Sequence, residues 1–212
     1  MEPTSMSLRS LQEIQRTRVF HESVVRGGMS QLLLGLDYLH EADIIHADLH
    51  SDNLLIALKD QTILEELEDD EITSPSARKI IANNTIHTSH FVLGGFGALI
   101  ISDFGQAGLG ERHSGNAMPV PYRAPEIILG LEWGSSIDIW ATGVLAWSLF
   151  HQESLFTIYD QTSTEMNDAH HLAYITALLG PRPLQLLQKT DKTKQYWDST
   201  GQWVGPVPLP DD

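Results

Sequence analysis

The sequence of 212 residues contains no cysteine. Without cysteine, the chain has neither a disulfide framework nor a metal site built from thiolates. It also lacks an apolar run of the about 18 residues that can span a membrane, and its N-terminus, MEPTSMSLRS, has no basic and then apolar signal pattern. We therefore expect an intracellular protein, cytoplasmic or nuclear, that makes no contact with a membrane.

Positive charge is scarce as well. The 13 Lys and Arg residues stand against 28 Asp and Glu residues, so the formal net charge is −15. Proteins that bind nucleic acid use Lys and Arg to replace the counterions of the phosphate backbone, so this balance argues against direct binding to nucleic acid. The charge is compatible with a basic protein partner, although solubility alone is the simpler explanation.

The apolar residues that are present suffice for a folded domain. They make up 42% of the chain, and their spacing predicts helices over about 24–40, 135–150 and 168–179 and strands at 54–57 and 98–101. The helix at 135–150 is apolar on nearly every side, so we expect it to be buried at the centre of the fold. The expected fold class is mainly α with short β hairpins, an α+β fold.

Two segments interrupt this pattern. The acidic run EELEDDE at 65–71 is followed by serine, proline and glycine breakers, which indicates a solvent-facing acidic insertion over 58–98. The last part of the chain is polar and ends in repeated prolines, so we expect 190–212 to be a frayed tail. Residues 1–20 are polar and show no clear period.

Short motifs with chemical potential follow one another along the chain. The run HADLHSDN at 46–53 places Asp48 and Asn53 on one loop. An Asp in such a loop can accept a proton from a substrate hydroxyl, and the carbonyl of an Asn can hold a metal ion. A D-F-G motif begins at Asp103 directly after a predicted strand. Its carboxylate can hold Mg²⁺ against nucleotide phosphates, while Gly105 lets the chain turn sharply.

The order of the motifs is more specific than any one of them. H-x-D-L-x-x-x-N is followed by D-F-G, then by A-P-E at 124–126, and D-I-W at 138–140 lies inside a predicted helix. This is the signature order of protein kinases. The chain resembles the C-terminal lobe of a eukaryotic-type serine/threonine protein kinase domain and is similar to the SR-protein kinase-like kinases of fungi. By this resemblance, residues 1–212 form a partial protein kinase domain.

The resemblance implies a role for each motif residue. Asp48 would be the catalytic base, Asn53 and Asp103 would hold Mg²⁺ and ATP, and His50 would lie near the transferred phosphate. Structural support would come from His46, Gly105, Glu126 and Asp138. The reaction would transfer the γ-phosphoryl group of ATP to hydroxyls of a protein substrate, and a basic substrate rich in Arg and Ser would suit the acidic chain.

The sequence also departs from the kinase pattern. Nothing before Asp48 reads G-x-G-x-x-G or V-A-I-K, so the resemblance implies a truncated form with little activity alone. Ala47 replaces an Arg that usually contacts a phosphorylated loop, His50 replaces a Lys, and Pro119 replaces a hydroxyl residue. We also expect Glu126 to lack the Arg of a late helix that usually pairs with it. These departures leave a catalytically inactive, pseudokinase-like binding module as an alternative.

A further alternative comes from the loop itself. HADLH at 46–50 also resembles the H-G-D-L-H loop of aminoglycoside and choline kinase-like phosphotransferases, which act on small alcohols. That family generally lacks the A-P-E and D-I-W motifs, both of which are present here. The histidines His87, His90, His170 and His171 lie apart from these motifs, and we expect surface or packing roles for them rather than metal binding.

Overall fold

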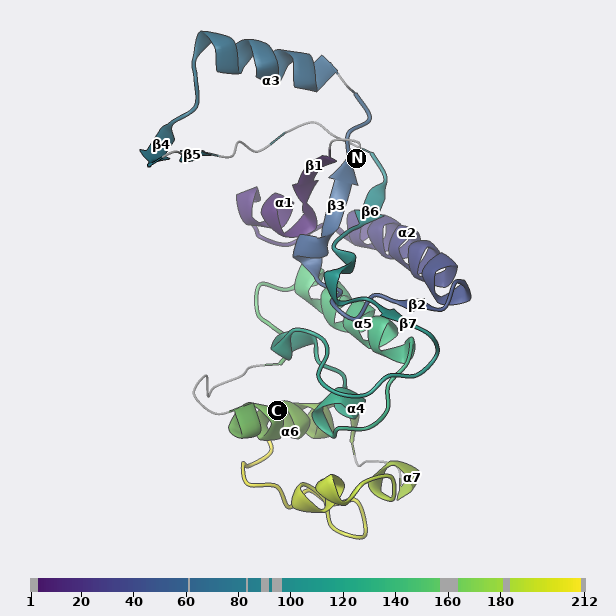
Figure 1. Cartoon of the computed structure of the whole chain (residues 1–212). Coiled ribbons are helices and arrows are strands. Elements are labelled where there is room, and N and C mark those ends of the chain that lie inside the picture. Colours follow the sequence, from purple (N-terminus) through teal and green to yellow (C-terminus); the bar gives the residue numbers. More distant parts are fainter. Residues whose placement is uncertain are drawn as a thin grey trace. The chain divides into compact units, whose positions relative to one another are not determined.

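The computed structural model of the chain describes residues 4–60, 62–82, 84–88, 92, 97–156, 164–180 and 184–210. The chain divides into two compact units, and Figure 1 labels the helices and strands that are described below. Unit 1 consists of Met1–Arg16 and Ser51–Ser102, and unit 2 consists of Thr17–His50 and Asp103–Asp212. No helix in the described part of the chain is both long and apolar enough to cross a lipid bilayer.

Unit 1 is built on a small antiparallel sheet. Its central strand β3 (Leu54–Ala57) pairs with β1 (Thr4–Ser7) and with β6 (Leu99–Ile101). The predicted strands at 54–57 and 98–101 are thereby confirmed, the second within one residue. Apolar residues of β3 and β6 lie opposite one another in register, with Leu55 opposite Ile100. This pairing brings together residues that are distant in the sequence.

The start of the chain was not foreseen. α1 (Leu8–Ile14) continues directly from β1, and Ser7 caps it by accepting a hydrogen bond from the N–H of Ser10 at 3.1 Å. Only Met6 and Leu8 are buried here. Elements that bury so few side chains leave no periodic pattern in the sequence, which is why both the strand and the helix were missed.

The acidic insertion has regular secondary structure. α3 (Thr62–Thr73) contains the acidic run, and β4 (Arg78–Ile81) forms an antiparallel hairpin with β5 (Asn84–His87). No residue of α3 is buried, and both hairpin strands are exposed along their length. The expectation that this segment faces solvent is confirmed for these elements, whereas its boundaries at 58 and 98 stay a prediction.

The two ends of the insertion lie next to each other at the end of the sheet, where Ala57 pairs with Gly97 and Ala98. The N–H of Ala57 donates to the carbonyl of Ala98 at 2.9 Å, and the N–H of Gly97 donates to the carbonyl of Ala57 at 3.1 Å. A β-carbon at Gly97 would lie 2.2 Å from that carbonyl oxygen, so only glycine fits there. The sheet therefore holds the two ends of the insertion together whatever the intervening sequence contains.

Two long helices form the first layer of unit 2. α2 (Glu22–Glu41) packs against α5 (Ser136–Phe150), and the N–H of Phe20 donates to the carbonyl of Leu149 at 2.9 Å. Both helices were predicted within two residues of these ends. α2 buries Val25, Leu32 and Leu36 on one face, as its apolar spacing requires.

The expectation that α5 is buried at the centre of the fold holds for one side of the helix and is wrong for the other. Residues on one side of the helix are buried, including Ile137, Ala141 and Leu145, but Ile139 is 50% exposed and Trp147 is 38% exposed. An apolar composition indicates that a helix can be buried, but it does not indicate how much of the helix surface the neighbouring elements cover. Asp138, which belongs to the candidate site described below, is among the buried residues of α5.

A second core lies in the C-terminal half of unit 2. It joins α4 (Pro125–Ile128), α6 (Thr164–Leu179) and the chain after η4 (Asp191–Gln195), while α7 (Leu184–Leu187) contributes partly buried leucines. The buried members of this core are Ile128, Leu129, Val144, Phe156, Ala169, Leu172, Ala173, Ile175, Tyr196, Trp197 and Val207. The helix predicted at 168–179 is confirmed as part of α6.

The expectation of a frayed tail over 190–212 is wrong for the described residues up to 210. Tyr196 and Trp197 are each 2% exposed, and their rings contact Trp203 at centroid distances of 5.9 and 5.6 Å. Polar composition and prolines suggested a loose tail. Three aromatic side chains within eight residues bury enough apolar surface to order it. Residues 211 and 212 lie outside the described part.

His171 generates a prediction about stability. Its ring is 1% exposed and lies 4.5 Å from the ring of Phe156. Burial, and to a lesser degree the charge of Arg123, lowers the pKa of His171 from 6.5 to about 3. The unfolded chain therefore binds a proton between these pH values that the folded chain does not bind. We expect the free energy of unfolding to fall by up to about 1.4 kcal/mol for each pH unit below 6.5.

Urea unfolding at pH 7.5 and 5.5 measures this effect. His171→Phe should remove much of the difference between the two pH values, because the titrating group is gone. His87→Gln, on the exposed strand β5, should leave the difference in place. An undiminished pH dependence in His171→Phe would show that another group is responsible.

Candidate active site

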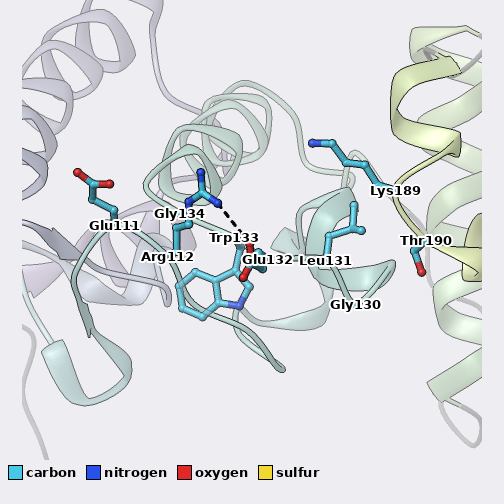
Figure 2. Close-up of a pocket in the computed structure, with 9 residues that line it drawn as sticks. All are labelled: Glu111, Arg112, Gly130, Leu131, Glu132, Trp133, Gly134, Lys189 and Thr190. Carbon is cyan, nitrogen blue, oxygen red and sulfur yellow. Dashed lines mark ion pairs between the residues drawn. The ribbon is translucent and has the colours of Figure 1, made fainter.

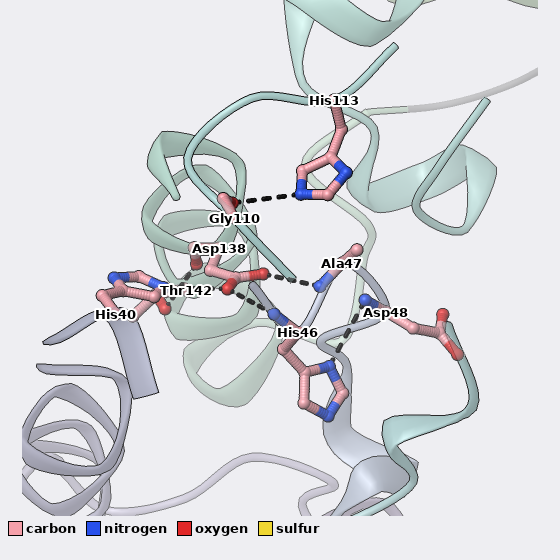
Figure 3. A network of polar contacts seen from close by, with 8 residues as sticks. All are labelled: His40, His46, Ala47, Asp48, Gly110, His113, Asp138 and Thr142. Carbon is pink, nitrogen blue, oxygen red and sulfur yellow. Dashed lines mark hydrogen bonds and ion pairs between the residues drawn. The ribbon is translucent and has the colours of Figure 1, made fainter. Parts of the chain in front are cut away.

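The carboxylate of Asp138 organises the loop that contains the HADLHSDN motif (Figure 3). Asp138 is 0% exposed on α5, and its two oxygens accept hydrogen bonds from the N–H groups of His46 at 2.8 Å and Ala47 at 2.9 Å. The Nε2 atom of His40 lies 2.9 Å from the same carboxylate. Asp138 also lies in the first turn of α5, where the helix dipole favours negative charge. These partners stabilise a buried charge that would otherwise be costly.

Ala47 is held in an unusual conformation. Its φ is 63°, in the left-handed region that alanine disfavours by roughly 1–2 kcal/mol. Its N–H donates to Asp138 and its carbonyl accepts from the N–H of Met118 at 3.0 Å. Ala47 is 1% exposed, so it contributes to the loop through its backbone groups. The strain persists because both backbone groups are engaged.

Asp48 follows directly and its side chain is half-buried. The N–H of Asp48 donates to Nδ1 of His46 at 3.3 Å, and the His46 ring meets the Phe104 ring edge-on at 5.1 Å. Nε2 of His50 lies 3.8 Å from Oδ1 of Asp48. The side chains of Asp48 and His50 are 24% and 22% exposed, which leaves the carboxylate within reach of a ligand. The structure thus brings His46, Asp48 and His50 together on one rigid loop.

Asp103 begins the 3-10 turn η2 (Phe104–Gln106) in an exposed position. Its φ is 61°, so Asp103, rather than Gly105, is the residue with the left-handed backbone. The N–H of Gly105 donates to Oδ1 of Asp103 at 3.2 Å. A β-carbon on Gly105 would lie 3.0 Å from that oxygen. A side chain at position 105 would therefore require the Asp103 carboxylate to shift slightly, whereas the turn itself does not require glycine there.

Asn53 lies in unit 1, whereas Asp48 and Asp103 lie in unit 2. It is 7% exposed at the end of η1 (Ser51–Asn53), and its carbonyl accepts from the N–H and the hydroxyl of Ser102 at 2.9 and 3.0 Å. Carboxylate and amide oxygens suit Mg²⁺, which binds through one or two protein ligands together with phosphates. The described residues contain no group of three or more His, Asp or Glu that could hold a metal ion.

Glu126 is half-buried at the start of α4, and its carboxylate accepts a hydrogen bond from the hydroxyl of Ser136 at 3.2 Å. The nearby ion pairs belong to other residues. Asp168 on α6 lies 3.6 Å from Arg123 and 3.7 Å from Lys192, and Lys192 donates to the carbonyl of Ile128 at 2.6 Å. A partly buried acidic residue of a late helix thus ties the A-P-E region to the C-terminal core. No motif or periodic pattern in the sequence predicts this arrangement.

Two further contacts were missed by sequence reasoning. His40 contacts Asp138 across a sequence separation of 98 residues, and Trp133 pairs with His113. Neither His40 nor Trp133 belongs to a recognisable motif, and each meets its partner only in the folded chain. A cavity of about 680 Å³ lies beside Trp133 (Figure 2). None of the predicted site residues, all of which the structure describes, lines this cavity.

Comparison with known proteins gives a consistent result. The protein kinase domain family matches residues 2–201. Serine/threonine protein kinase AFUB_078980 of Aspergillus fumigatus is 40% identical over 215 residues, which cover 99% of this chain and 51% of that protein. Serine/threonine-protein kinase AFC3 of Arabidopsis thaliana is 29% identical over 184 residues, covering 86% of this chain and 41% of that protein. The chain spans about half the length of the curated relatives it matches.

A solved structure extends the comparison to the fold. The crystal structure of the kinase domain of PF14_0431 matches with a TM-score of 0.69 and 24% sequence identity, and the match covers 97% of this chain and 56% of that one. This similarity confirms the predicted mainly helical, kinase-like α+β fold.

The network around Asp138 generates a second prediction. Asp138→Ala removes the acceptor for two buried N–H groups while Ala47 keeps its strained backbone, so we expect the free energy of unfolding to fall by about 3–5 kcal/mol. Asp138→Asn keeps one acceptor oxygen and should lose less. Urea unfolding followed by tryptophan fluorescence measures both, with Asp70→Ala on the exposed helix α3 as a control that changes stability by less than about 0.5 kcal/mol. An alanine variant as stable as this control would contradict the assigned role.

Proposed function

Since the chain belongs to the protein kinase domain family, we propose that it provides the catalytic-loop part of a serine/threonine protein kinase that transfers the γ-phosphoryl group of ATP to protein hydroxyls. The observation that carries the proposal is the loop held by Asp138, which presents the carboxylate of Asp48 half-exposed on a fixed backbone. A general base must be held within hydrogen-bond reach of the proton that it accepts, and a rigid loop meets that requirement.

The proposed roles follow the motif positions. Asp48 orients the substrate hydroxyl and accepts its proton, while Asn53 and Asp103 hold Mg²⁺ and ATP. When bound, Mg²⁺ and ATP supply the phosphoryl group and neutralise its charge. His50 contributes to binding the transferred phosphate, since its ring lies beside Asp48. His46, Gly105, Glu126 and Asp138 act as structural supports of these groups.

We also propose a basic protein substrate, rich in Arg and Ser as expected for an SR-protein kinase-like enzyme, and a cytoplasmic or nuclear location. Support comes from α3. Its last turn contains acidic residues and no basic one, which is unfavourable at the negative end of a helix dipole. A cationic partner bound along this exposed helix would relieve that repulsion.

A binding module without catalysis is the second candidate. It is favoured by the contact between His50 and Asp48 at 3.8 Å, because a protonated imidazole there would pair with the catalytic carboxylate. Ala47 adds to this, since the buried methyl group offers no cation to a phosphorylated segment. A small-molecule phosphotransferase is disfavoured, because the named relatives of the chain are protein kinases.

A titration with Mg²⁺ and ATP separates the candidates. We expect the purified chain to bind the nucleotide in the micromolar range and Asp103→Ala to abolish binding, because the metal loses its carboxylate ligand. Asp48→Asn is the matched control. It should leave binding intact while reducing phosphoryl transfer to a peptide, because an amide cannot accept the proton.

The outcomes are distinct. Binding that is lost in Asp103→Ala and retained in Asp48→Asn supports the kinase proposal. No binding by the unmodified chain supports the module without catalysis. Binding that Asp103→Ala leaves unchanged would show that the nucleotide is held elsewhere.

The substrate proposal has its own test. Changing Glu65, Glu66, Asp69 and Asp70 to Lys should weaken binding of an Arg-Ser repeat peptide about tenfold or more at low salt, measured by fluorescence anisotropy. As a control for general charge, Asp37→Lys with Glu41→Lys reverses exposed acids on α2 and should have a much smaller effect. Equal affinity in the α3 variant and the unmodified chain would exclude docking on this helix.

A further inference from the structure

Trp133 contacts the segment at 113–115 through its backbone, its indole N–H and its ring. Its N–H donates to the carbonyl of His113 and its carbonyl accepts from the N–H of His113, both at 2.9 Å. Its indole N–H donates to the carbonyl of Gly115 at 3.1 Å. The indole and the imidazole of His113 also stack, with centroids 4.7 Å apart and an interplanar angle of 27°. Trp133 is 8% exposed, so these contacts are well shielded from water.

Two glycines make room for this arrangement. A β-carbon at Gly108 would lie 2.8 Å from the imidazole of His113, and a β-carbon at Gly134 would lie 2.8 Å from the carbonyl oxygen of Glu111. His113 also contacts the carbonyl of Gly110 through Nε2 at 3.1 Å (Figure 3). The chain at 108–115 is therefore closed tightly on itself and on 133–134. Larger side chains at either glycine would push these segments apart.

The same stretch is joined at one end to the residues that lead into the HADLHSDN loop and at the other end to Ala47 of the loop itself. On one side, β7 (Gly108–Leu109) pairs with β2 (Ile44–Ile45), and the N–H of Gly110 donates to the carbonyl of Asp43 at 2.7 Å. On the other side, the N–H of Met118 donates to the carbonyl of Ala47 at 3.0 Å. The contacts with Trp133 lie between these two attachments, and all of the residues belong to unit 2.

We propose that Trp133 is a positioning residue, which clamps the segment 108–118 through His113 and Gly115 and so fixes the segment that borders Asp48. The His113–Trp133 clamp consists of stacking and uncharged hydrogen bonds. The neighbouring ion pair between Arg112 and Glu132, 3.5 Å long (Figure 2), has side chains 78% and 70% exposed and contributes little. The catalytic consequence of the clamp rests on the proposed kinase function, whereas its structural effect does not.

Hydrogen exchange of the whole chain tests the structural effect. The amides of Gly110, His113 and Met118 are reporters, because each donates one of the bonds described above. In Trp133→Ala these amides should exchange roughly tenfold faster or more, while amides of α2 and α6 keep their rates. Trp133→Phe keeps a ring for stacking and loses only the bond to Gly115, so it should give a smaller increase. Glu132→Gln breaks only the exposed ion pair and should change nothing.

The outcomes separate the clamp from general stability. Faster exchange confined to 108–118, graded from alanine to phenylalanine, supports the proposal. Unchanged exchange in both Trp133 variants overturns it. If Trp133→Ala unfolds the chain, Trp133→Phe decides: faster exchange in 108–118 alone supports the clamp, and equal acceleration throughout unit 2 overturns it.

Kinetics then test the catalytic consequence. In Trp133→Phe, we expect a higher KM for a peptide substrate with an unchanged Mg²⁺-ATP affinity, because the clamp acts on the segment beside Asp48. Equal losses in peptide KM and nucleotide affinity would overturn this positioning role. If the unmodified chain does not bind Mg²⁺-ATP, or if Asp103→Ala leaves that binding unchanged, the kinase proposal fails, and the exchange experiment still decides whether the clamp exists.

Discussion

The buried carboxylate of Asp138 is the interaction on which the geometry of the candidate site depends. Ala47 has a left-handed backbone that alanine would abandon in a free loop. The bonds from His46 and Ala47 to Asp138 remove that choice, because leaving two buried N–H groups without an acceptor would cost more than the strain. The direction in which Asp48 leaves the loop is therefore set from α5, a helix that contains none of the residues proposed to contact the substrate, Mg²⁺ or ATP.

Two further sets of contacts, made by Met118 and by Trp133, hold the backbone next to the site. The N–H of Met118 donates to the carbonyl of Ala47, and Met118 itself has a positive φ of 66°. The pair of strained residues is stable only as long as the segment 108–118 keeps its place, which makes the contacts of Trp133 with His113 relevant to the loop. The strained backbone of Ala47 is therefore maintained by a series of contacts, from Asp138, from Met118 and from the segment 108–118.

Much of the fold was predictable because it depends on local pattern. The apolar spacing of α2 and α5 gave both helices within two residues, and motif order pointed to Asp48, Asn53 and Asp103. The rest depends on contacts between distant residues. β1 exists only as a partner of β3, the chain near Trp197 is ordered by packing on other elements, and His40 finds Asp138 across 98 positions. A single sequence contains no periodic signal for such pairs.

The substitution at position 47 has a narrower effect than the sequence suggested. Alanine at position 47 offers no cation, yet the groups that shape the loop are the N–H and the carbonyl of the residue, which every amino acid except proline provides. The loop geometry therefore does not depend on the side chain at this position. Position 50 differs, because its imidazole lies 3.8 Å from the carboxylate of Asp48 and its protonation would change the charge that a substrate hydroxyl meets. If this chain differs from its relatives in activity, His50 has the more direct physical route to that difference.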